Sequence, residues 1–93
     1  MSFEALASKY ITSTETVLRQ MQRARESITV NEESVNNIVG YVTAYLADAK
    51  YYKDQKRFET SLTSIAYCEG LLDALRLLGA VKFEWPAGTK NGK

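Results

Sequence analysis

The sequence predicts an all-α protein, an antiparallel up-and-down three-helix bundle with a short extended C-terminal tail. Apolar residues recur at helical spacing in three separate stretches, and each stretch forms a single apolar arc that needs a neighbour to cover it. The connections between the stretches are short, which favours antiparallel helices around one core. We therefore expect one domain at residues 1–80, with helices at about 3–28, 32–53 and 57–78, followed by an extended segment and flexible tail at 81–93.

The first predicted helix is long because neither glycine nor proline interrupts its apolar stripe. Ser2 suits the N-cap position, and Glu4 follows in the first turn, where the helix dipole favours negative charge. The stripe that should face the core consists of Phe3, Leu6, Tyr10, Val17, Met21, Ala24 and Ile28.

The second and third helices are bounded by residues that commonly begin or end helices. Asn31 suits the N-cap of the second helix, and Asp54, in the polar turn that follows, is a candidate cap for the third. Gly79 stands where a helix C-cap needs the left-handed conformation. Cys68, in an apolar context on the third helix, is expected to be a small core residue and not a nucleophile.

An extended segment is expected after the third helix. Val81, Phe83 and Trp85 alternate with polar residues, which places the three apolar side chains on one face.

Composition excludes several classes of function. The 93 residues contain no histidine and one cysteine, so the chain has no Ser–His or Cys–His pair and none of the usual zinc sites. No glycine-rich phosphate-binding motif occurs either, and we expect a protein that is not an enzyme and needs no cofactor. A net charge of +1 gives no overall attraction to nucleic acid or membranes. Without a membrane-spanning run or a signal peptide, the expected location is cytoplasmic.

Polar side chains at or inside the apolar stripes of the second and third helices form the candidate site. They are two tyrosines and three carboxylates: Tyr45, Asp48, Tyr52, Glu69 and Asp73. One interpretation is a structural seam, in which tyrosine hydroxyls and an arginine, Arg25 or Arg76, satisfy the carboxylates. The other is a small-ligand or divalent-cation site, because carboxylates without histidine suit Mg²⁺ or Ca²⁺.

Aromatic residues outside the predicted core indicate a surface for a partner. Tyr51 and Tyr67 fall on the outer sides of their helices, and Phe83 and Trp85 follow in the extended segment. Tyrosine and tryptophan are enriched at interface hot spots. The leading hypothesis is therefore a module that binds a protein partner or self-associates.

A basic cluster at the turn between the second and third helices leaves a further alternative. Lys50, Lys53, Lys56 and Arg57 lie close to Tyr51 in sequence, a combination found in proteins that bind nucleic acids. Neighbouring acidic residues dilute the charge, so nucleic-acid binding is the weakest of the three hypotheses.

Residues 35–80 resemble a small archaeal family known as domain of unknown function family 357. The matching residues are Tyr45, Asp48-Ala49, Tyr52, Phe58, Ile65-Ala66-Tyr67, Glu69-Gly70-Leu71-Leu72-Asp73-Ala74 and Leu78-Gly79. The resemblance implies a three-helix up-and-down bundle of archaeal cytoplasmic origin with no established activity. The first helix is similar only in length and character, and residues 55–57 replace the glycine or short acidic turn usual in the family.

Overall fold

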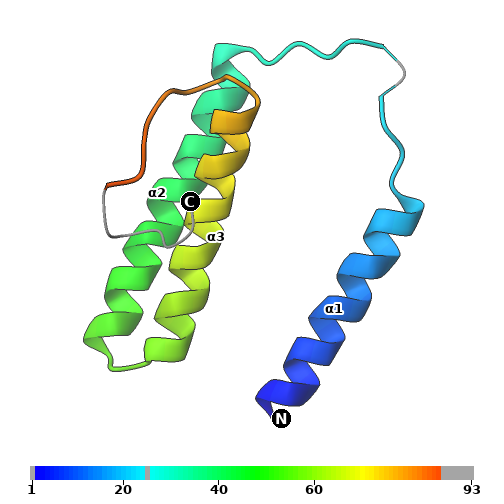
Figure 1. The fold of residues 1–93 in the computed structure, drawn as a ribbon. Helices are drawn as coiled ribbons and strands as arrows, with labels where there is room; N and C mark the ends of the chain where they lie inside the picture. The colour runs from blue at the N-terminus through cyan, green and yellow to red at the C-terminus, as the bar shows by residue number, and fades with distance from the viewer. Residues whose placement is uncertain (1, 25, 87–93) are drawn as a thin grey trace.

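The computed structural model describes residues 2–24 and 26–86 and contains three helices, α1 (Phe3–Gln20), α2 (Glu32–Asp54) and α3 (Phe58–Leu77) (Figure 1). No strand occurs among these described residues. The predicted all-α, three-helix fold is therefore confirmed. α2 and α3 run antiparallel side by side, and α1 runs opposite to α2 at a distance from it (Figure 1).

The packed unit is the hairpin of α2 and α3. These are the only two helices of the described chain that contact each other. Val42 and Ala49 of α2 are buried against Cys68 and Leu75 of α3. The connecting turn is tight, and Lys56 within it adopts a left-handed backbone with φ of 61°. The core is consequently small and lies in one seam.

α1 stands apart from the hairpin and has no buried residue. Its apolar stripe is exposed along its length, with Phe3 71%, Tyr10 61% and Val17 59% accessible. The radius of gyration is 15.8 Å, whereas a compact chain of this length has about 12 Å. The apolar arc of α1 was predicted to complete one core with the other helices, but in this structure the buried residues all come from α2 and α3.

The end of α1 corrects the prediction. The sequence indicated a helix to residue 28, but α1 ends at Gln20, and Met21 adopts an extended backbone with ψ of 148°. Local preference does not account for this end, because Met21 and Gln22, which follow it, have good helix propensity. A helix whose apolar stripe packs on no other helix is marginal in water, so nothing extends α1 further, and Ile28 is 69% exposed in a linker.

The capping residues mostly follow the sequence. Ser2 Oγ accepts from the Ala5 amide at 3.0 Å, and Asn31 Oδ1 accepts from the Ser34 amide at 2.8 Å. Gly79 has φ of +79° and lies in the turn closing α3, where the Ala80 amide donates to the Leu75 carbonyl at 2.9 Å. Asp54 is not the cap of α3, because it is the last residue of α2 and Arg57 takes that position without a side-chain hydrogen bond.

Beyond α3, residues 80–86 fold back along the hairpin as an extended segment, which we call the strap (Figure 1). Val81, Phe83 and Trp85 are half-buried, whereas Lys82 and Glu84 are exposed, as the alternating sequence pattern predicts. The predicted flexible tail at 87–93 lies outside the described residues. None of the helices described here combines the length and the apolar character needed to cross a membrane.

Candidate functional site

Two side-chain hydrogen bonds join α2 and α3 across the seam. Ser61 Oγ donates to the Ala49 carbonyl at 2.7 Å, and Cys68 Sγ donates to the Val42 carbonyl at 3.4 Å. Small side chains on both helices let the backbones approach closely enough for these bonds. The seam is therefore both apolar and hydrogen-bonded.

Cys68 is a core residue, as the sequence predicts, and is 2% exposed. Burial raises the pKa of its thiol; a backbone hydrogen bond opposes this, and the negative charges of Glu69 and Asp48 add to it. The thiol is protonated at neutral pH, which disfavours nucleophilic chemistry.

The three candidate carboxylates do not converge. Val42 on α2 and Cys68 on α3 face each other across the seam. Around the α2 axis, Asp48 lies about 120° from Val42, which places it on one side of the hairpin. Around the α3 axis, Glu69 lies about 100° from Cys68, which places it on the opposite side. Asp48 is exposed, whereas Glu69 and Asp73 are half-buried. No group of three acidic, cysteine or histidine side chains among the described residues is placed to hold a metal ion.

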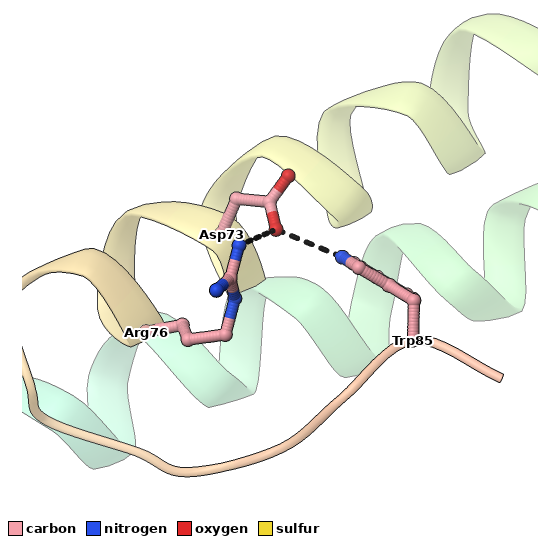
Figure 2. Close-up of polar contacts among 3 residues, drawn as sticks. All are labelled: Asp73, Arg76 and Trp85. Atoms are coloured by element: carbon pink, nitrogen blue, oxygen red, sulfur yellow. Dashed lines mark hydrogen bonds and ion pairs between the residues drawn. The ribbon is translucent and has the colours of Figure 1, made fainter. Parts of the chain in front are cut away.

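Asp73 anchors the strap to α3 (Figure 2). Trp85 Nε1 donates to Asp73 Oδ1 at 2.9 Å, and Arg76 donates from one guanidinium nitrogen to the same oxygen at 3.4 Å. The Phe83 and Trp85 rings meet edge to face with centroids 5.0 Å apart, and the Arg76 guanidinium lies 5.6 Å from the Phe83 ring centre. One carboxylate thus organises a cluster of four side chains.

At Asp73 this arrangement supports the structural interpretation. Arg76 and Trp85 both donate to its carboxylate, and the sequence did not indicate the tryptophan. The structural interpretation offered Arg25 or Arg76 as a group that could reach Glu69, and the ion pair of Arg76 is with Asp73. The alternative partner, Arg25, lies outside the described residues.

The tyrosines occupy one side of the hairpin, which we call the tyrosine flank and define by Tyr41, Tyr45 and Tyr67. Tyr45 and Tyr67 meet across the seam with ring centroids 4.7 Å apart. Tyr67 is 52% exposed, so it is accessible as predicted, but one edge is already occupied by Tyr45.

At the turn, Tyr51 is 58% exposed and lies edge to face with Tyr52 at 5.3 Å. The Arg57 guanidinium stacks 4.9 Å from the Tyr52 ring centre. One of the four basic residues of this cluster is therefore engaged within the hairpin.

The other side of the hairpin carries exposed aliphatic and aromatic residues. We call it the apolar flank and define it by Val39, Leu46, Phe58 and Leu62. They are 38%, 39%, 54% and 67% exposed, respectively. Helical geometry places them together, because each is rotated from the seam in the direction opposite to the Tyr45–Tyr67 pair.

Two surface hollows formed by the described residues are open to solvent. The hollow of about 430 Å³ at the open end of the hairpin is lined mainly by backbone caps and by Val30, Val35 and Leu78. Another, of about 380 Å³, separates the α1 stripe from Thr60 and Thr63 of α3. It marks the gap between α1 and the hairpin.

The functional feature that sequence reasoning missed is the exposure of the α1 stripe. The apolar periodicity of α1 predicts burial in a core of the same chain, but it fits burial by another molecule equally well. The hydroxyl-rich and β-branched composition of α1 was a signal that this helix depends on packing, but it does not identify what covers it.

A protein-family model described as "Protein of unknown function (DUF357)" matches residues 9–81 of the chain. The match takes in most of α1, the linker, the hairpin and the start of the strap, and therefore extends beyond the region of resemblance found from the sequence. No curated protein matches the chain, and no solved structure does.

Proposed function

Because the chain belongs to this family of proteins of unknown function, DUF357, we propose its role from its own geometry: a non-enzymatic helical module for protein–protein interaction or self-association. The observation that carries the proposal is the apolar stripe of α1, which no other helix of the described chain contacts. α1 is the docking element, and the hairpin is the folded body that presents it.

The composition of α1 supports this role, because the helix is a poor candidate for stability in isolation. It has 18 residues, and its centre contains Ile11, Thr12, Thr14, Thr16 and Val17, all β-branched. Isolated helices of about this length are marginal in water even when rich in alanine. Covering the stripe would supply the missing free energy, so α1 gains its stability from whatever it binds.

The polar groups support a binding role over a catalytic one. The single thiol is buried and protonated, and the carboxylate of Asp73 is engaged by Trp85 and Arg76. Phe83 and Trp85, predicted as part of the partner surface, are half-buried in the strap. Tyr51 and Tyr67 are more accessible and serve as a secondary surface. Cys68 is a free thiol, which supports a cytoplasmic location.

Site-specific photo-crosslinking tests the proposal. A benzophenone amino acid replaces Tyr10 on the α1 stripe, or Thr12 on the opposite side of the same helix as the matched control, and the cells that make the protein are irradiated. We expect a discrete adduct to a second polypeptide from position 10 and none from position 12. Crosslinks from position 10 that reach only the hairpin of the same chain, or equal adducts from both positions, would overturn the proposal.

A further inference from the structure

Two apolar surfaces of this chain face solvent and differ in kind. One is the convex stripe of a single helix, α1, and the other is the apolar flank of the α2–α3 hairpin, where Leu46, Phe58 and Leu62 lie beside the seam. A helix that packs beside an antiparallel pair is the simplest way to close a three-helix core. The two surfaces are therefore complementary in shape and chemistry.

α1 is long enough to cover the part of the flank that remains open. α1 has 18 residues and α3 has 20, which correspond to about 27 and 30 Å of helix. The strap occupies the flank near Asp73 through Trp85 and leaves the end near the turn to Leu46, Phe58 and Leu62. Residues 87–93 contain no large apolar side chain and are a poor match for that patch.

Within one chain, α1 does not lie on the apolar flank. It lies on the other side of α3, where its stripe shares a hollow with three polar residues of α3: Glu59, Thr60 and Thr63. The described residues of the linker between α1 and α2, 21–24 and 26–31, are exposed, which suits the open hinge that exchange of an element between two copies requires (Figure 1).

The exposed area is large enough for a stable dimer. The chain exposes 8175 Å², whereas a compact monomer of this mass exposes about 5,400 Å². The excess over the whole chain is about 2,700 Å², comparable with the roughly 1,000–2,500 Å² that each partner buries in an obligate homodimer.

We propose that two copies of this chain form a twofold dimer by helix exchange, in which the α1 stripe of each copy packs on the apolar flank of the other's α2–α3 hairpin. This rests on the proposed interaction role of α1 and names its partner as a second copy. Twofold symmetry closes the assembly, because each copy donates one α1 and receives one. Tyr10, Val17 and Leu18 are then buried against Leu46 and Leu62.

The first experiment measures molar mass by light scattering and sedimentation across a concentration series. Wild type should be a dimer at about 100 μM. Tyr10→Lys should raise the dissociation constant about 100-fold, because each stripe contributes about tenfold and the symmetric dimer contains two. The matched control Thr12→Lys, on the polar side of α1, should leave the dissociation constant within about twofold. A wild-type monomer at this concentration would overturn the dimer.

The second experiment identifies the interface by disulfide formation between two different chains. One chain carries Ala7→Cys. The other, longer by a purification tag, carries Lys50→Cys on the apolar flank or Tyr51→Cys at the same height on the outer side. Ser61 bonds to the carbonyl of Ala49, so Lys50 lies level with the α3 residues that α1 approaches. Cys68 stays in both chains, since it is buried, and a chain with Cys68 alone gives the background.

We expect the mixed disulfide from the Lys50→Cys chain and only background from the Tyr51→Cys chain. A dimer that crosslinks equally at both positions, or only between two copies of α1, would overturn the exchange. A monomer whose position 10 crosslinks to another identified protein would overturn the inference and leave the proposed function standing. A monomer with crosslinks only inside its own chain would overturn both.

Discussion

Removing the carboxylate of Asp73 should release the strap from the hairpin. Asp73→Ala deletes the acceptor of the 2.9 Å bond from Trp85 and of the 3.4 Å contact from Arg76. A hydrogen bond to a carboxylate contributes about 1.5 kcal/mol. The pair with Arg76 adds only a few tenths of a kcal/mol, because the arginine side chain is 39% exposed. The total is about 2 kcal/mol, which corresponds to about a 30-fold lower ratio of docked to undocked strap.

The assay uses Trp85, which is the only tryptophan in the sequence and lies in the strap itself. Asp73→Ala should shift its emission to longer wavelength and increase quenching by acrylamide, because the half-buried indole becomes exposed. Asp73→Asn keeps a neutral acceptor and should give an intermediate result. Asp48→Ala, which removes an exposed carboxylate from the opposite flank, is the control and should leave the emission unchanged. Circular dichroism checks that helix content is retained.

The reasoning would be refuted if acrylamide quenched Trp85 in Asp73→Ala no more than in wild type. The strap would then be held by other contacts, such as the packing of Val81 and Phe83, and the hydrogen bonds in Figure 2 would be a consequence of docking and not its cause.

Three further predictions concern the hairpin. Leu75→Ala should lower the free energy of unfolding, measured in urea, by about 3 kcal/mol, because Leu75 is 1% exposed. The control Leu77→Ala, at a position that is 79% exposed, should change it by less than about 0.5 kcal/mol. Equal effects of the two substitutions would contradict the seam as the core. Gly79→Ala should lower the free energy of unfolding by about 1 kcal/mol, because a φ of +79° disfavours a side chain although the space around Gly79 is open. No change in the same assay would mean that the α3 C-cap does not form. Because the folded state raises the pKa of the Cys68 thiol, the unfolded chain loses this proton first, and the free energy of unfolding should fall as pH rises above about 8.5. Cys68→Ala should lack this pH-dependent fall. Identical pH profiles for the two proteins would argue against a contribution from the thiol.

The sequence predicts those parts of the fold that local chemistry determines. The all-α class follows from apolar periodicity, and the caps Ser2, Asn31 and Gly79 follow from side-chain hydrogen bonding and backbone preference over a few residues. The end of α1 and its separation from the hairpin depend on tertiary contacts. Apolar periodicity shows only that the stripe of α1 favours burial, and it does not show which surface buries it. The true end, Gln20, carries no glycine or proline signal.

The candidate site was predictable in part. The buried state of Cys68 and the exposure of Tyr51 and Tyr67 follow from helical phase. The partner of Asp73 does not, because Trp85 reaches it only after the chain reverses at Gly79 and folds back. No spacing rule connects residues on the two sides of such a reversal.

The two hydrogen bonds across the seam have a mechanical consequence. Ser61 and Cys68 lie one heptad apart on α3, and their acceptors on Ala49 and Val42 lie one heptad apart on α2. Apolar contacts between so few side chains would tolerate axial sliding of one helix along the other, but a directional bond to a particular carbonyl does not. The bonds therefore fix the axial register of α2 against α3 at two points. The hairpin moves as one rigid unit, and the residues on its surface keep a constant spacing.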